Sequence, residues 1–215
     1  MSITGWKQFT PFYFVTAMAV CLIGFIGREG LSWTEILLFV TSGLLSWTLI
    51  EYVLHRFVFH HDAHSEFGKN LLFRVHLSHH ENPSNTKILS SLLISLVIAP
   101  AYLLLASVVT GSWRGAFYVL IGVAAGYFYY EWLHFYVHHG RPRLRLLRYL
   151  RTYHLLHHHQ TPELRFGVTS PLIDLIFGTF RPVDDSTTPT MSGRRAIHRL
   201  RRLHRSKTRG AKLSG

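Results

Sequence analysis

Four long apolar segments alternate with polar stretches along most of the chain. They run from about Phe9 to Gly27, Trp33 to Phe59, Ile88 to Val109 and Gly115 to Val137. Each is close to or longer than the roughly 20 residues that an α-helix needs to cross a bilayer. The pattern predicts an all-α integral membrane protein with four transmembrane helices. The first segment exceeds the roughly 7–15 apolar residues of a signal peptide core, which favours a retained span over a cleaved leader.

Positive charge collects on one side of these predicted spans. The opposite side carries only Arg28, Glu29, Glu35 and Arg114. By the positive-inside rule both termini and the long polar regions are cytoplasmic, at a bacterial inner membrane or the endoplasmic reticulum. This distribution explains most of the net charge of +12 without a nucleic-acid partner, and none is expected. The basic residues of the cytoplasmic side are Arg56, Lys69, Arg74, Lys87, Arg141, Arg143, Arg145, Arg148 and Arg151.

Ten of the 16 histidines recur in two halves of the chain at matched spacings. His60 and His76 lie 16 residues apart, and so do His138 and His154. Each half reads as two spans, a histidine at the cytoplasmic end of the second span, and a short H-x-x-H-H helix, which indicates an internal repeat. The ten are His55, His60, His76, His79, His80, His134, His138, His154, His157 and His158.

The spacing of these histidines predicts metal binding. At about 100° per residue, the three histidines of each H-x-x-H-H sequence share one helical stripe and can converge on a metal. His55 and His60 are five apart and fall off a common stripe, so the second span is expected to end or bend near Phe59. Ten imidazoles are too many for one ion, which favours two metals with about five histidines each. Imidazole suits iron, zinc, copper or nickel.

Two acidic residues, Glu51 and Glu131, precede the histidines in each half. The di-iron bundles that use four Glu and two Glu-x-x-His pairs fit poorly, because only Glu131 and His134 have that spacing. We therefore expect the two carboxylates to orient imidazole N–H groups or balance charge; snorkelling to water is the alternative. The remaining histidines are expected to be solvated residues: His61, His64, His139, His159, His198 and His204.

In order and spacing, the histidine motifs resemble those of the fatty acid hydroxylase superfamily, integral-membrane enzymes with a histidine-bound dimetal centre. "EYVLHRFVFH", "YHLLHH" and "FGVTSPLIDLIFGTF" (Phe166 to Phe180) are most similar to the fatty acid 2-hydroxylases of sphingolipid acyl chains. His159 stands where those relatives usually have Tyr, and Ile173 where they often have Trp. The resemblance covers residues 45 to 182.

The resemblance implies a membrane-bound di-iron monooxygenase. Such an enzyme uses O2 and two electrons to hydroxylate the carbon next to an acyl carboxyl, with the ten histidines as metal ligands in a cytoplasmic helical cap. Zinc can replace iron in a purified sample. The sequence has no counterpart of the cytochrome b5 domain fused to many eukaryotic members. A membrane lipid substrate and an external donor, such as a cytochrome b5-like protein or a ferredoxin and its reductase, are therefore expected.

The chain then divides into three parts. Residues 1–44 hold the first span and the start of the second, residues 45–182 form the catalytic region, and residues 183–215 form a tail. The final stretch "SGRRAIHRLRRLHRSKTRGAKLSG" carries nine of the 23 Lys and Arg residues. This composition predicts a disordered cytoplasmic tail; a basic helix on anionic headgroups is the alternative.

Other classes of function fit the same sequence features. A sterol or carotenoid-type hydroxylase or a lipid desaturase of the same superfamily would use a related histidine pattern. A membrane metal-binding or transport protein is the non-enzymatic alternative, but a transporter places its ligands near the bilayer midplane. Here the histidines lie at and beyond the ends of the predicted spans. The single cysteine, Cys21, excludes a disulfide or a cysteine-based metal site within one chain.

Overall fold

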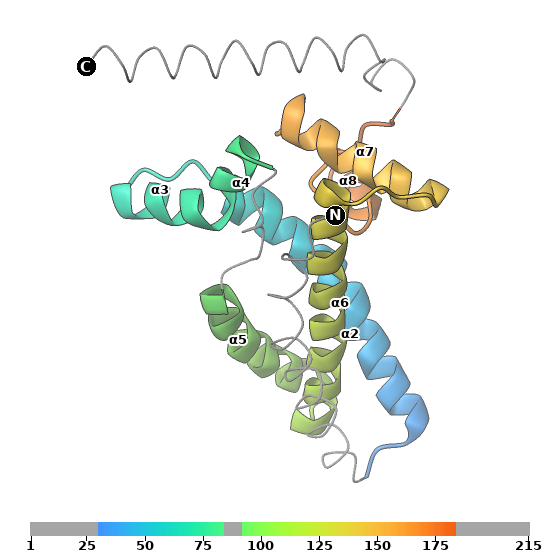
Figure 1. Cartoon of the computed structure of the whole chain (residues 1–215). Helices are drawn as coiled ribbons and strands as arrows, with labels where there is room; N and C mark the ends of the chain where they lie inside the picture. The colour runs from blue at the N-terminus through green and yellow to red at the C-terminus, as the bar shows by residue number, and fades with distance from the viewer. Residues whose placement is uncertain (1–29, 84–91, 184–215) are drawn as a thin grey trace, which may run out of the picture. The chain divides into compact units, whose positions relative to one another are not determined.

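The computed structural model describes residues 30–83 and 92–183, and every regular element in these ranges is a helix. Two long helices, α2 (Trp33–Val53) and α6 (Trp113–His139), pack along each other, and α5 (Leu92–Thr110) packs on α6. Figure 1 shows these three as a stem with the shorter helices at one end. The all-α prediction is confirmed for the described residues, whereas the first predicted span and the basic tail lie outside them.

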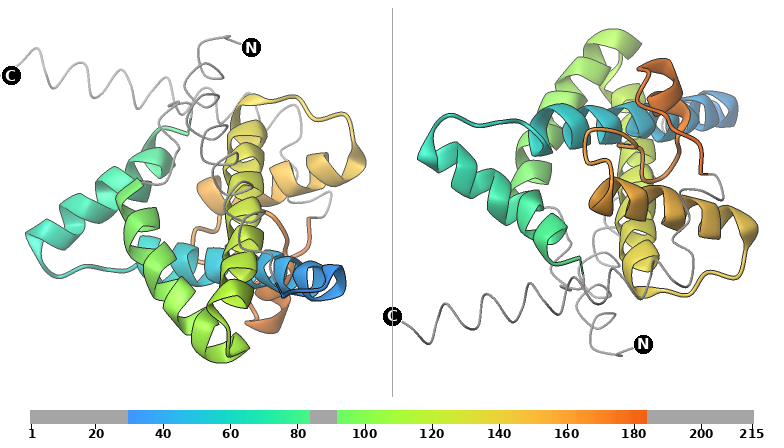
Figure 2. Two further views of the ribbon diagram at one scale, coloured as in Figure 1. Left: turned by 90° about the horizontal axis from the view of Figure 1, so that it is seen from below. Right: turned by 90° about the horizontal axis from the view of Figure 1, so that it is seen from above.

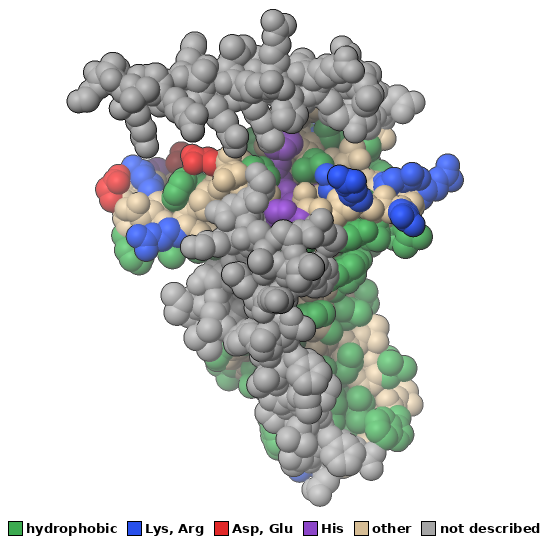
Figure 3. All heavy atoms as spheres, viewed as in Figure 1, with side chains coloured by type: hydrophobic (Ala, Val, Ile, Leu, Met, Phe, Trp, Pro, Cys, Tyr) green, Lys and Arg blue, Asp and Glu red, His purple; other side chains and the backbone are tan. Residues whose placement is uncertain are grey.

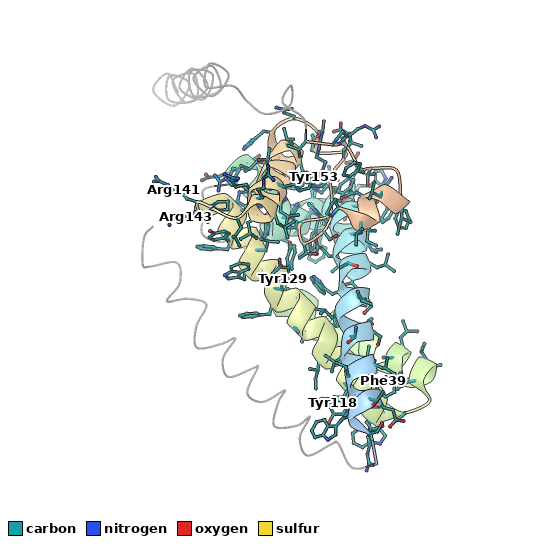
Figure 4. All side chains as sticks on the ribbon, turned by 90° about the vertical axis from the view of Figure 1, so that its right-hand side faces the viewer. Phe39, Tyr118, Tyr129, Arg141, Arg143 and Tyr153 are labelled. Atoms are coloured by element: carbon teal, nitrogen blue, oxygen red, sulfur yellow. The ribbon has the colours of Figure 1, made fainter. Side chains whose placement is uncertain are left out.

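The shorter helices form the end of the molecule that carries the histidines. They are η1 (Leu54–Phe59), α3 (Glu66–Leu72), η2 (Phe73–Leu77), α4 (Ser78–Glu81), α7 (Arg145–His159) and α8 (Leu172–Ile176). Figure 2, seen from above, shows α7 and the chain that follows it beside the end of α6. In Figure 4, Phe39 and Tyr118 mark the opposite end of the stem from Tyr153, Arg141 and Arg143. Arg141 and Arg143 therefore lie at the same end as the histidines.

Helix α2 begins at a well-formed cap. Ser32 and Glu35 make a capping box, in which the Glu35 carboxylate accepts the Ser32 N–H at 2.8 Å and the Ser32 hydroxyl accepts the Glu35 N–H at 3.3 Å. From there the helix runs without a break in apolar character into η1. Together Trp33–Phe59 have the length and hydropathy of a membrane span, as predicted, and large apolar side chains such as Leu37 and Leu45 are exposed.

The other predicted spans correspond in position to α5 and α6. The described apolar part of α5, Ala99–Thr110, is shorter than a bilayer crossing, and Trp33–Phe59 is the one described helix that has both the length and the hydropathy of a span. The four-crossing topology therefore stays a prediction. The described residues up to Arg181 belong to one compact unit.

Two glycines allow α2 and α6 to approach closely. A Cβ atom added at Gly43 would lie 1.9 Å from the Val119 carbonyl oxygen, and one added at Gly122 would lie 2.1 Å from the Val40 carbonyl oxygen. Contact between helix backbones at this distance excludes any side chain, and small residues of this kind are typical of helix pairs in membranes. The hydropathy pattern did not identify this crossing.

Candidate metal centre

All ten repeated histidines come together in two groups of five at the end of the stem. Within each group, the ligand nitrogen atoms lie within 4.8 Å of one another. Figure 3 shows histidine side chains at the level of the shorter helices, where Lys and Arg also gather. The first histidine group contains His55, His60, His76, His80 and His157. The second histidine group contains His79, His134, His138, His154 and His158.

Each H-x-x-H-H sequence is divided between the two groups. His76 and His80, one α-helical turn apart, have their Nε2 atoms 2.9 Å apart in the first group, whereas His79 belongs to the second. The second copy behaves in the same way. His154 and His158 lie 3.0 Å apart in the second group, and His157 belongs to the first. The three histidines of one stripe thus serve two groups, because the middle side chain leans toward the opposite half of the molecule.

The two groups are therefore related by a reciprocal exchange. Each half of the sequence supplies four histidines to its own group and one, either His79 or His157, to the other. His80 and His158 occupy equivalent positions in the two halves, and their rings stack with centroids 4.0 Å apart and planes inclined by 17°. The internal repeat predicted from the sequence thus corresponds to two interlocked groups that meet at this stacked pair.

A π-helical turn brings His55 and His60 to the same group. Helix η1 is a π-helix, and the His60 N–H donates to the His55 carbonyl at 3.2 Å, five residues back. Residues five apart in a π-helix lie one above the other, as residues four apart do in an α-helix. The helix ends at Phe59, as predicted, but the histidine spacing did not predict the wider π-helical turn. A second π-helix, η2, carries His76.

The spacing of the imidazole nitrogens fits a metal with several ligands. Within the groups, neighbouring Nε2 atoms are separated by 2.9 to 3.3 Å. At metal–nitrogen bond lengths of about 2.1 Å, a 90° angle at the metal separates two ligand atoms by about 3.0 Å and a tetrahedral angle by about 3.4 Å. The spacing therefore favours right-angled coordination with more than four positions over a tetrahedral site. A hydrogen bond can join only two of these nitrogens, whereas one metal cation can bind the lone pairs of all five.

Backbone carbonyls fix the orientation of two imidazoles in the first group. His55 Nδ1 lies 2.5 Å from the Phe166 carbonyl, and His157 Nδ1 lies 2.7 Å from the Leu164 carbonyl. Because a carbonyl can only accept, both Nδ1 atoms carry the hydrogen and donate it, which leaves each Nε2 lone pair facing the group. Metal-binding histidines are commonly held in this way.

Burial keeps these imidazoles neutral. It lowers the pKa of His79 to about 4 and that of His80 to about 2, with neighbouring histidines adding to the effect for His80. Burial likewise holds the pKa of His76 and His157 well below the usual value of 6.5. A neutral imidazole is the form that binds metals, so at physiological pH these side chains need not lose a proton first.

The two predicted acidic residues are both buried, but Glu51 has a different partner from the one expected. Its carboxylate accepts the backbone N–H groups of Val168 and Thr169 and the Thr169 hydroxyl, and it makes no hydrogen bond to an imidazole among the described residues. Glu131 lies on α6 one turn before His134 and is 1% exposed. Glu51 thus acts on the chain after α7 rather than on a histidine directly.

Sequence reasoning missed a third buried carboxylate, Asp174. It is fully buried on α8 and accepts the backbone N–H groups of Phe166 and Gly167. These residues belong to the segment whose carbonyls bind His55 and His157. Asp174 belongs to the quoted sequence "FGVTSPLIDLIFGTF", but its position follows no repeated spacing that would connect it with the histidines. Of the histidines expected to be solvated, His61, His64 and His159 are exposed, His139 is half-buried, and none of these four belongs to either group. His198 and His204 lie outside the described residues.

Comparison with known proteins places this architecture. The fatty acid hydroxylase family model matches residues 39–179, so the chain belongs to the fatty acid hydroxylase family. This confirms the resemblance seen in the histidine motifs and identifies an oxidoreductase of the hydroxylating type.

Individual relatives agree with the family assignment. A dihydroceramide fatty acyl 2-hydroxylase of Arabidopsis thaliana (FAH2) is 34% identical over 163 residues, covering 74% of this chain and 68% of the relative. The human fatty acid 2-hydroxylase is 32% identical over 145 residues, covering 65% of this chain and 38% of the longer relative. A solved structure described as full-length scs7p with only the hydroxylase domain visible superposes with a TM-score of 0.70 at 28% identity, covering 78% of this chain and 66% of that one.

Proposed function

We propose that this chain is a membrane-bound dimetal monooxygenase that hydroxylates a lipid acyl chain at its 2-position. The observation that carries the proposal is the pair of five-histidine groups at the end of an apolar helical stem. The relatives named for 2-hydroxylation of fatty acyl chains supply the substrate class.

The donor set suits redox-active iron. Each group of five neutral imidazoles would hold one ion, and the spacing of about 3 Å between neighbouring Nε2 atoms suits a donor set of more than four nitrogens. Two iron ions held by the two groups would supply the O2 chemistry that an unactivated C–H bond requires, since acid–base side chains alone cannot break such a bond. All ten histidines are ligands in this proposal, and zinc can occupy the same positions in a purified sample.

The position of the site along the span favours oxidation near the lipid carboxyl. His55 and His60 lie at the end of Trp33–Phe59, so in this proposal the groups lie where this helix would leave the bilayer. Carbons close to a lipid headgroup reach this level, whereas mid-chain carbons lie deeper. In the proposed topology the chain crosses four times, with both termini and the site cytoplasmic. Two electrons come from an external donor such as a cytochrome b5-like protein or a ferredoxin with its reductase.

Mass spectrometry of lipids from cells that make the protein tests the proposal. Wild type is expected to add one oxygen at the 2-position of acyl chains. The His157→Ala, His158→Ala double variant removes one ligand from each group and is expected to abolish the product. His159→Ala, on the same helix but exposed and outside both groups, is the matched control and keeps it. Equal lipids in wild type and double variant would refute hydroxylation. A product oxidised only at mid-chain or on a sterol or carotenoid ring would refute the substrate class, and desaturated acyl chains would refute the reaction type.

A further inference from the structure

The segment after α7 supports one histidine group and not the other. It contains the sequence "FGVTSPLIDLIFGTF", and none of the ten proposed ligands lies in this sequence. Two of its carbonyls, at Leu164 and Phe166, accept the Nδ1 hydrogens of His157 and His55. Both histidines belong to the first group. The segment therefore orients two of the five imidazoles there through its backbone.

Asp174 holds this backbone in place. One carboxylate oxygen accepts the Phe166 N–H at 2.8 Å and the Thr179 hydroxyl at 2.7 Å, and the other accepts the Gly167 N–H at 2.8 Å. The Phe166 residue thus donates to Asp174 through its N–H and accepts from His55 through its carbonyl. A shift of the Asp174 carboxylate moves the group that orients His55.

The turn needs this support, because its backbone is strained. Arg165 lies between the two accepting carbonyl residues and has a φ of 62°, which is uncommon for a residue other than glycine. At Gly167, an added Cβ would lie 2.1 Å from the Ser170 carbonyl oxygen. The hydrogen bonds to Asp174 offset the cost of this tight conformation.

Glu51 forms hydrogen bonds with the next part of the same turn. Its carboxylate accepts the Val168 and Thr169 N–H groups, so two buried carboxylates bind four successive backbone amides. The second histidine group differs. Among the described residues, its buried Nδ1 atoms on His79, His134, His154 and His158 have no hydrogen-bond partner. The carboxylate-held turn is therefore a device of the first group alone.

We propose that Asp174 is a positioning residue for the first histidine group and sets how firmly that group, but not the second, holds its metal. The inference rests on the metal centre of the proposed function. In Asp174→Asn, the amide NH2 replaces one accepting oxygen, so it opposes a backbone N–H that it cannot bind. Loss of a group that orients a metal-bound histidine typically weakens metal binding about 10–100-fold.

Timed metal release from the full-length protein in detergent tests the inference. The protein is loaded with cobalt(II), counted by elemental analysis, and exposed to a colorimetric chelator. Wild type is expected to bind two equivalents. Asp174→Asn is expected to release one of them about 10–100-fold faster, with the other unchanged, and to alter the cobalt absorption spectrum of the first group. Asp62→Asn, a matched change at an exposed aspartate, is expected to behave as wild type.

A milder variant covers the case in which Asp174→Asn does not fold. Thr179→Val removes one donor to Asp174 and is expected to speed release of the same single equivalent to a smaller extent. Equal acceleration of both equivalents, or no acceleration of either, in the variant that folds overturns the role of Asp174 while leaving the proposed function intact. If wild type binds fewer than two equivalents, the dimetal centre of the proposed function fails instead.

Discussion

Replacing Gly122 by alanine tests whether the contact between α2 and α6 builds the metal centre. The new Cβ would lie 2.1 Å from the Val40 carbonyl oxygen and 2.7 Å from the Leu44 nitrogen, both of them backbone atoms that cannot rotate away. Ordinary contact begins at 3.4 Å, so the two helices would have to separate by roughly 1 Å or more. A metal site tolerates errors of only about 0.2 Å in its bond lengths.

The separation has consequences for stability and for both histidine groups. Overpacking costs about 1–3 kcal/mol, and contact with rigid backbone places Gly122→Ala at the upper end. At about 2–4 °C per kcal/mol for a chain of this size, the melting temperature should fall by roughly 6–12 °C. Metal content should fall as well, because η1, which continues α2, carries His55 and is followed directly by His60, and α6 carries His134 and His138.

Gly115→Ala is the matched control on the same helix. Its Cβ would meet the tip of the Phe39 ring at 2.9 Å, and this contact is with the far end of a side chain that can shift rather than with backbone. Both variants gain the same intrinsic helix propensity, up to about 1 kcal/mol. Thermal unfolding in detergent and elemental analysis measure the two effects. Equal melting temperatures and full metal content in both variants would refute the reasoning that the glycine contact sets the spacing of the histidine-bearing helices.

Two further predictions concern the histidine-bearing end. Burial lowers the pKa of His60 and His79 from 6.5 to about 4, so between these values the unfolded chain binds protons that the folded chain does not. The metal-free protein should be most stable above about pH 6.5 and should lose stability as the pH falls toward 4. Chemical denaturation that gives the same free energy of unfolding across this pH range would contradict the prediction. Arg151 donates hydrogen bonds to the Val137 and Gly140 carbonyls at 2.5 and 2.8 Å. Arg151→Met should therefore destabilise the protein by about 1–3 kcal/mol, whereas Arg148→Met, at an exposed position, should not. Equal melting curves for the two variants would exclude a stabilising role of the Arg151 hydrogen bonds.

The sequence alone located the longest helices of the described residues and the ten histidines, for local reasons. An apolar run longer than a bilayer crossing predicts a helix whatever its neighbours are, and Trp33–Phe59 has those bounds in the structure. The repeated histidine spacings likewise need no knowledge of packing, since two matched copies indicate a shared role. The family and the oxidoreductase class followed from the same motifs and agree with the match over residues 39–179.

Only the tertiary structure decided how those residues combine. The division of each H-x-x-H-H sequence depends on which side chain faces the other half of the molecule, a contact between residues far apart in the chain. The π-turn at His60 and the glycine contact of α2 with α6 are likewise set by packing. The role of Asp174 could not be predicted from the sequence. Asp174 acts on His55 through the backbone of Phe166, which is more than 100 residues from His55 along the chain, and only folding brings these residues together.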